Sequence, residues 1–259
     1  MTLDYLECGN KDAPLLMMFI HGGGVSGWMW DQQIRYFSQY HCIVPDLPEH
    51  GRSKDGIFSI RGSAEALLRL LDEKAAGKKA AVTGFSLGSQ ILIQMLSLKP
   101  DAIDFAIINS ALVRPMPSVK YWIRPAIQLS YPLIKYRWFS KLQASSLSIS
   151  EANFEAYYEE SRRVQASTLI RVLNENMSFE IPGNFRMAAG RILVTVGEKE
   201  KAVMKKSAGD IVKANPACTG ILLPDTGHGA PLAKPGFFNE MVDSWIHGRE
   251  LPKKCLKLN

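Results

Sequence analysis

A serine with a glycine two positions away on each side is the most informative chemical feature of this chain. The run Gly84-Phe85-Ser86-Leu87-Gly88 follows an apolar stretch, residues 80–83, and precedes a helical pattern, residues 89–98. In a sharp turn from a strand to a helix such a serine takes a strained backbone conformation, and the glycines avoid collisions with the neighbouring strand and helix. The spacing predicts that Ser86 is a nucleophile, and an ordinary serine in a tight turn is the competing interpretation.

A glycine-rich turn, His21-Gly22-Gly23-Gly24, follows another apolar stretch, residues 15–20. Consecutive glycines leave backbone N–H groups uncovered, and two preorganised donors stabilise the oxyanion that forms when a nucleophile attacks an ester carbonyl. We predict that the N–H groups of Gly23 and Leu87 form this oxyanion hole. A flexible turn or a phosphate-binding loop is the alternative, but neither a G-x-G-x-x-G nor a Walker pattern is completed here.

One of the five histidines, His228, lies late in the chain, directly after the apolar stretch 220–223. A base must accept the serine proton near neutral pH, and the ordinary pKa of histidine suits this role. The other four histidines lie at a strand start, in a late helix, in the glycine turn and in the loop after Asp46. We therefore predict that His228 is the base.

A carboxylate that orients the histidine is expected after the apolar stretch 191–196, where Gly197-Glu198-Lys199-Glu200 follows. Glu200 is our candidate for this role. Glu198 and Asp225 remain alternatives, and the competing interpretation of each acid is a solvated loop residue or a charge at a helix start.

Six short apolar stretches bounded by turn residues predict the strands of a buried, mostly parallel sheet. They cover residues 15–20, 41–44, 79–83, 105–108, 191–196 and 220–223, with 3–7 as an additional edge strand. Helical patterns lie between them at 31–38, 63–76, 89–98, 201–214 and 235–245. This alternation predicts an α/β fold with helices on both faces of the sheet, and ligands of such sheets bind beyond the carboxyl ends of the strands.

The alternation stops in residues 112–187, which combine helical periodicity with prolines and many aromatic residues. We expect a helical cap insertion here, with residues 1–111 and 188–259 forming the core. Substrate choice is then expected to depend mainly on the cap. The candidate substrate-binding residues are Gly24, Trp28, Trp122, Tyr131 and Trp138. Packing inside the cap is the competing explanation for the aromatic residues.

The positive charge of the chain is concentrated in one segment. The formal net charge is +6, and residues 105–150 contain six Lys and Arg residues but no Asp or Glu. An anionic substrate, an acidic membrane surface, or pairing with Glu151, Glu155 and Glu159 inside the cap would each account for this segment. We favour pairing over membrane association, because these glutamates recur at i, i+4 spacing. Nucleic-acid binding is not expected, because no recognised module accompanies the charge.

Composition favours a single-domain cytoplasmic protein. The chain has 259 residues, of which 46% are hydrophobic, and no apolar stretch approaches the roughly 20 residues that span a bilayer. The first residues have neither the basic start nor the apolar core of a secretory signal. The four cysteines show no metal-ligand spacing, so neither a disulfide nor a zinc site is implied, and no cofactor is expected.

These features together resemble the α/β-hydrolase superfamily, in particular its small, capped, esterase-like members. The order Ser86, Glu200, His228 is the chain order of nucleophile, acid and base in that superfamily. Further similar segments are the glycine turn followed by Trp30, residues 45–53, and the stretch 227–238. The chain departs from the common pattern at Glu200, where aspartate is more usual, and at Glu49 and Ser89, where glycine is frequent.

The resemblance implies an α/β-hydrolase fold and a serine hydrolase that cleaves a carboxylic ester of a small, partly apolar molecule through an acyl-enzyme. Dehalogenases and epoxide hydrolases of this fold use an aspartate nucleophile, so Ser86 argues against both. Cleavage of a carbon–carbon bond by the same triad remains open, as does a ligand receptor with slow turnover.

Overall fold

A mostly parallel eight-stranded sheet forms the centre of the protein. The computed structural model describes residues 2–147 and 149–258. The strand order is β1-β3-β2-β4-β5-β6-β7-β8. The six inner strands, β2 to β7, run parallel to one another, and β1 and β8 are antiparallel edges. The strands are β1 (Tyr5–Gly9), β2 (Leu15–Ile20), β3 (His41–Pro45), β4 (Lys79–Phe85), β5 (Phe105–Asn109), β6 (Arg191–Gly197), β7 (Cys218–Leu223) and β8 (Leu256–Lys257).

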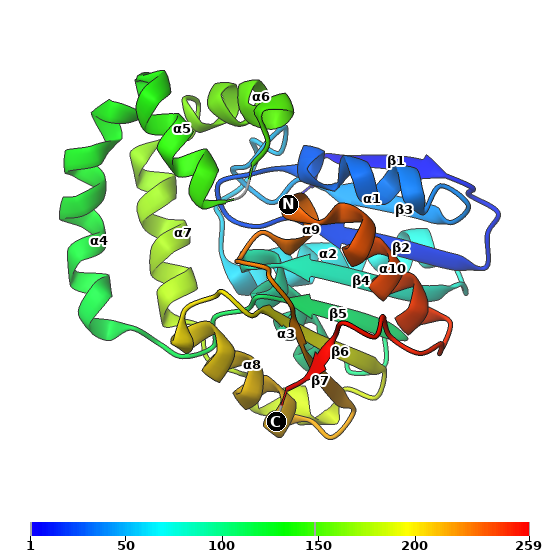
Figure 1. The fold of residues 1–259 in the computed structure, drawn as a ribbon. Coiled ribbons are helices and arrows are strands. Elements are labelled where there is room, and N and C mark those ends of the chain that lie inside the picture. The colour runs from blue at the N-terminus through cyan, green and yellow to red at the C-terminus, as the bar shows by residue number, and fades with distance from the viewer. Residues whose placement is uncertain (1, 148, 259) are drawn as a thin grey trace.

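Helices cover both faces of this sheet, as the sequence predicts (Figure 1). Successive side chains of a strand point to opposite faces, so Met18 and Phe19 of β2 belong to separate buried clusters. The cluster of Met18 is completed by α2 (Ile60–Ala75), α3 (Leu87–Leu98) and α8 (Ala202–Ala214). The cluster of Phe19 is completed by α10 (Pro235–Ile246) and by buried side chains such as Trp30. Every residue of β2 is buried, which explains its unbroken apolar sequence.

The remaining core elements are short. They are the 3-10 helix η1 (Gly27–Trp30) and the helices α1 (Asp31–Tyr36) and α9 (Ala230–Ala233). The edge strand lies two residues later than predicted, because its register is set by pairing with β3, from Tyr5 opposite Pro45 to Gly9 opposite His41. The strand β8 was not predicted, since two residues carry no readable alternation.

The chain between β5 and β6 is helical. Its described parts, residues 112–147 and 149–187, contain no strand. The elements are α4 (Pro117–Ser130), η2 (Tyr131–Lys135), α5 (Arg137–Ser146), α6 (Glu151–Ser161), α7 (Ala166–Ser178) and η3 (Gly183–Met187). Figure 1 shows α4 to α7 grouped beside the sheet, with α4 farthest from it. Within this group α4 packs against α7 and α5 packs against α6. Among the described residues, none of the helices has the length and apolar character needed to cross a bilayer.

Glu49 fastens α7 to the core. Its carboxylate accepts hydrogen bonds from the backbone N–H of Phe58 at 2.8 Å, from Thr168 Oγ1 at 2.8 Å and from Arg171 Nη1 at 2.5 Å. Burial alone would raise the pKa of Glu49, but these hydrogen bonds and the charge of Arg171 outweigh burial and lower it. Glu49 thus connects the loop after β3 to the helical segment.

Candidate active site

The predicted elbow is present at the end of β4. Ser86 has φ +52° and ψ −112°, which is a strained conformation for a residue with a side chain. Its backbone N–H donates to the carbonyl of Asn109 at 2.9 Å, and α3 begins at the next residue, Leu87. The helix therefore begins two residues before the predicted start at Ser89.

The glycines on either side of Ser86 allow three backbone segments to approach closely. A Cβ atom at Gly84 would lie 2.6 Å from the carbonyl oxygen of Gly88, and a Cβ at Gly88 would lie 2.4 Å from the carbonyl oxygen of Ile20. Both clashes are with backbone, which cannot move aside as a side chain can. The spacing of the two glycines is thus a steric requirement of the turn.

We expect Gly88→Ala to lower the free energy of unfolding by about 1–3 kcal/mol, because the new methyl group would overpack the contact with β2. Gly209→Ala in α8 is the matched control: nothing lies within 4 Å of its Cβ position, and alanine in a helix is up to about 1 kcal/mol more favourable than glycine. Urea unfolding followed by circular dichroism measures both. Equal stability of Gly88→Ala and the native protein would contradict the steric argument.

His228 lies between Ser86 and Glu200. Its Nδ1 is 2.8 Å from Glu200 Oε2, and its Nε2 is 3.0 Å from Ser86 Oγ. An ionised carboxylate can only accept, so Nδ1–H donates to Glu200, and Nε2 is left to accept the Ser86 hydroxyl proton. The His228 ring also packs against Phe85, with 5.1 Å between ring centroids. Three residues that are up to 142 positions apart are thereby joined in one hydrogen-bonded chain.

The Glu200 side chain is almost completely buried, with 2% exposed. Its Oε1 accepts hydrogen bonds from Ser110 Oγ at 2.7 Å and from the backbone N–H of Gly197 at 2.9 Å. Burial alone would raise the pKa of Glu200, but the hydrogen bond and charge of His228, with these two further donors, outweigh burial and lower it. The buried carboxylate is therefore held in its ionised form.

The two alternative acids lie elsewhere. Glu198 Oε2 accepts the backbone N–H of Asp225 at 2.9 Å, and the Asp225 carboxylate lies 3.3 Å from Lys199 Nζ. Of the three candidates, the structure brings Glu200 to His228.

Ser110 was missed in the sequence analysis. It immediately follows β5, has φ +58°, and donates to Glu200. Its position directly after a strand of the parallel sheet was the one available signal, since functional side chains gather there.

The glycine turn is held by His21, which is fully buried. His21 Nε2 accepts the backbone N–H of Leu47 at 2.9 Å, so the ring proton is on Nδ1, which donates to the carbonyl of Gly22 at 2.7 Å. Burial, together with the nearby His50, lowers the pKa of His21 to about 3, so its ring is neutral near pH 7. His21 thus links the turn after β2 to the loop after β3.

The two predicted oxyanion donors belong to adjacent segments. A Cβ at Gly23 would lie 3.5 Å from Leu87 Cδ2, in ordinary contact. Leu87 is the first residue of α3, and the N–H groups of a first helical turn have no partner within the helix. Gly23 therefore lies next to Leu87, the residue that follows Ser86.

A small cavity adjoins the glycine turn. Gly24 lies on its wall with the apolar side chains Val25, Ile134 and Leu169, and with Glu160. Glu160 accepts hydrogen bonds from Ser26 Oγ at 2.7 Å and from Trp28 Nε1 at 2.8 Å. Burial raises the pKa of Glu160, and these two hydrogen bonds oppose the rise only in part. The cavity is mainly apolar, with one carboxyl group on its wall.

The other predicted substrate-binding residues differ in position. Trp28 and Tyr131 do not line the cavity but hydrogen-bond to residues that do. Trp28 Nε1 donates to Glu160, and the Tyr131 hydroxyl donates to the carbonyl of Val164 at 3.1 Å. Trp122 and Trp138 are not brought to the cavity: they are 71% and 62% exposed. Aromatic residue type did not reveal which side of its helix faces the core.

Comparison with known proteins finds relatives and solved structures that share the fold described above. The model of the alpha/beta hydrolase family matches residues 17–241. An esterase of Mycobacterium tuberculosis is 34% identical over 90 residues, which cover 34% of this chain and 30% of that protein. The magnesium-chelatase 30 kDa subunit of Rhodobacter capsulatus is 26% identical over 265 residues, covering 94% and 90% of the two chains. The crystal structure of the enol-lactonase from Burkholderia xenovorans LB400 superposes with a TM-score of 0.80 at 14% identity, covering 95% of this chain and 96% of that one.

Proposed function

Because this chain belongs to the alpha/beta hydrolase family, as its sequence pattern predicted, we propose that it is a serine hydrolase that cleaves a carboxylic ester of a small, partly apolar molecule. The observation that carries the proposal is the continuous chain of hydrogen bonds from Ser86 through His228 to Glu200. A serine, a histidine and a buried carboxylate in this geometry are the components of nucleophilic acyl transfer.

In the first half of the reaction, Ser86 Oγ bonds to the ester carbonyl carbon while His228 Nε2 takes the serine proton. The Gly23 and Leu87 N–H groups stabilise the resulting oxyanion, and loss of one such donor typically costs about 3 kcal/mol of transition-state stabilisation. Collapse of the intermediate breaks the bond to the leaving alcohol, which takes the proton from His228. Ser86 then carries the acyl group.

In the second half, His228 Nε2 removes a proton from water as the water oxygen attacks the acyl carbon. The same two N–H groups stabilise the second oxyanion. The bond to Ser86 Oγ then breaks, Ser86 regains a proton from His228, and the carboxylic acid leaves. Glu200 accepts the Nδ1–H hydrogen bond throughout and stabilises the histidine while it is protonated. The residues proposed here carry out both halves without a cofactor.

The cavity beside the glycine turn, whose lining residues do not include Ser86 or His228, supports this substrate class. Val25, Ile134 and Leu169 offer apolar contact to an acyl or alcohol group of modest size. Glu160 is the one carboxyl group on the wall, beside the polar residues His50, Gln143, Tyr157 and Ser161, and it can contact a hydroxyl of the substrate.

A panel of p-nitrophenyl esters of increasing acyl length, beside an acyl thioester, an anilide and a 2,4-diketone, tests the proposal. We expect saturable turnover of short and medium esters, with the thioester and anilide slower. Cleavage of the diketone without ester turnover would show that the protein hydrolyses a carbon–carbon bond and not an ester. Negligible turnover of all compounds, with an increase in unfolding temperature when one is bound, would instead indicate a receptor.

A further inference from the structure

Helix α4 has exposed apolar side chains in addition to those of its packed face. Ile123, which is 5% exposed, lies on the face that packs against α7. Tyr121 lies opposite Ile123 on the helix, and Trp122 and Leu129 lie about 100° and 120° from Ile123 on one flank. These three side chains are 83%, 71% and 82% exposed. A helix with an apolar outer face in addition to its packed face marks a contact with something outside the chain, because large exposed apolar patches are uncommon in monomeric proteins.

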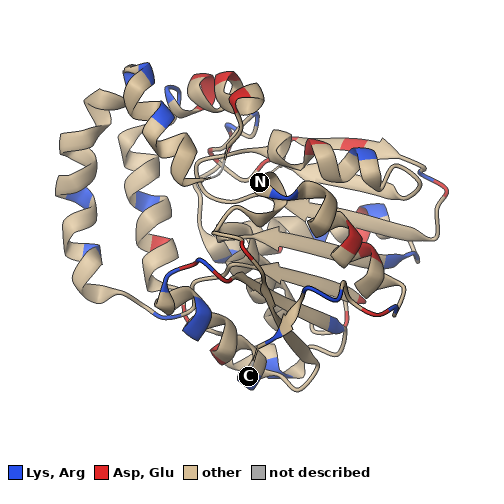
Figure 2. Cartoon of the chain, in the orientation of Figure 1, with Lys and Arg blue, Asp and Glu red and all other residues tan. Residues whose placement is uncertain are grey.

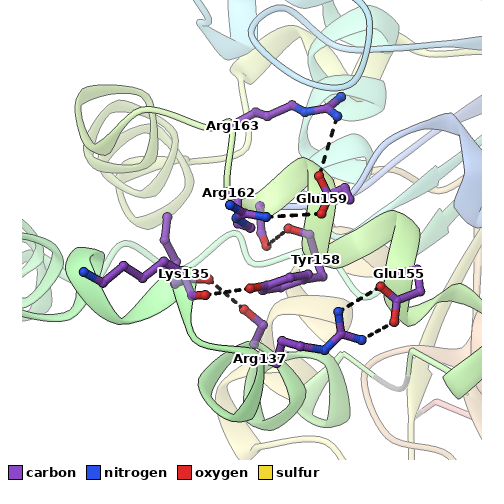
Figure 3. A network of polar contacts seen from close by, with 10 residues as sticks. Lys135, Arg137, Glu155, Tyr158, Glu159, Arg162 and Arg163 are labelled. Atoms are coloured by element: carbon purple, nitrogen blue, oxygen red, sulfur yellow. Dashed lines mark hydrogen bonds and ion pairs between the residues drawn. The ribbon is translucent and has the colours of Figure 1, made fainter.

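Part of the positive charge of this region is neutralised within the protein. Arg114 pairs with Asp210, with 2.9 Å between Arg114 Nη2 and Asp210 Oδ1, and Arg137 pairs with Glu155 (Figure 3). Lys141 Nζ lies 3.9 Å from Glu151.

Fewer ion pairs join the basic residues of 105–150 to Glu151, Glu155 and Glu159 than the sequence led us to expect. Glu159 contacts Arg162 and Arg163 of its own segment instead of a cation from residues 105–150 (Figure 3). Across the described residues, no carboxylate lies within ion-pair distance of Lys120, Arg124 or Lys135. Lys120 and Arg124 are on α4 itself, and Figure 2 shows α4 with basic bands and no acidic one.

We propose that the outer face of α4, defined by Lys120, Tyr121, Trp122, Arg124 and Leu129, binds the surface of an anionic phospholipid bilayer. Trp and Tyr side chains partition to the boundary between headgroups and acyl chains, and Lys and Arg are attracted to anionic headgroups. The charge of the face is complementary to such a surface, and its aromatic residues suit the boundary layer. The inference does not rest on the proposed hydrolase activity.

The geometry of α4 fits binding parallel to the membrane plane. It has 14 residues, fewer than the roughly 20 needed to span a bilayer, so it is suited to lying at the interface. It is also the helix of its group farthest from the sheet, so its outer face can meet a flat surface without the core intervening (Figure 1).

Co-sedimentation with vesicles tests the proposal. The full chain is mixed with vesicles of phosphatidylcholine alone or with added phosphatidylglycerol, at low and high salt. We expect binding to the anionic vesicles that weakens at high salt. Lys120→Gln with Arg124→Gln should weaken it by about fivefold per cation removed. The matched control is Lys253→Gln with Lys254→Gln, two exposed lysines outside the helical segment, which should bind like the native protein.

A second variant tests the apolar contribution without changing charge. Tyr121→Ser with Leu129→Ser should reduce binding to anionic vesicles at unchanged unfolding temperature, since both side chains are exposed. The proposal is overturned by absence of binding to anionic vesicles, or by an equal loss in the α4 and control lysine variants, which would indicate general attraction of a chain with net charge +6. It is also overturned if the native protein is a dimer that Tyr121→Ser with Leu129→Ser dissociates, because a second copy would then cover this face.

Discussion

Replacement of Ser86 by alanine is expected to lower ester turnover by a factor on the order of 10⁵ to 10⁶, as loss of a serine nucleophile does in comparable triads. The hydroxyl 3.0 Å from His228 Nε2 would be gone, and no acyl-enzyme could form. Initial rates with a p-nitrophenyl ester measure the loss. A fluorophosphonate probe followed by mass spectrometry should label Ser86 in the native protein and label nothing in Ser86→Ala.

Ser118→Ala is a suitable control for that experiment. Ser118 is exposed on α4, so the same loss of a hydroxyl group there should leave turnover and labelling unchanged. Labelling of Ser86→Ala to the native extent at another residue would show that Ser86 is not the nucleophile.

Glu200→Gln is expected to lower kcat by about 10³ to 10⁴ near neutral pH with little change in KM. The amide group can donate a hydrogen bond to Nδ1 of His228, which leaves the ring proton on Nε2, where it cannot accept the serine proton. The amide also carries no charge to stabilise the protonated ring. Steady-state kinetics on the best ester of the panel measures the loss.

Glu198→Gln is the matched control, because it makes the same chemical change two residues away on an exposed carboxylate. We expect it to keep nearly full activity. If Glu198→Gln lost as much activity as Glu200→Gln, or if Glu200→Gln lost none, the assignment of Glu200 as the triad acid would be wrong.

The lowered pKa of Glu200 adds a dependence of stability on pH. A carboxyl group whose pKa is lower in the folded state stabilises the fold above its ordinary pKa of 4.5. That contribution to stability is lost as the pH falls through the pKa that Glu200 has in the folded state. The difference in unfolding temperature between the native protein and Glu200→Gln should therefore be constant near neutral pH and change only below about pH 5. A difference that does not vary with pH would show that Glu200 is not held ionised by the fold.

The strands and the elbow were readable from sequence because their causes are local. Burial on both faces makes β2 a continuous apolar run, and the close approach of backbones at Gly84 and Gly88 excludes side chains. The order of strands along the chain also indicated which loops gather at one edge of the sheet. His228 follows from this order, since it comes directly after the last inner strand.

The outer face of α4 shows where local reasoning stops. Trp122 was a candidate for the substrate pocket, yet it is 71% exposed, whereas the neighbouring Ile123 is 5% exposed. A helix with apolar residues on both sides has no single preferred inner face in its own sequence. The docking of α7 decides which side is buried.

The sequence by itself determined the α/β alternation, the glycine spacing around Ser86, and the order of nucleophile, acid and base, because backbone sterics and burial act on neighbouring residues. Only the tertiary structure selected Glu200 over Glu198 and Asp225, brought Ser110 to its carboxylate, and directed Glu160 toward the cavity. Those outcomes depend on distances between loops that are tens of residues apart. Such distances are fixed by how the strands and helices pack, which no local pattern records.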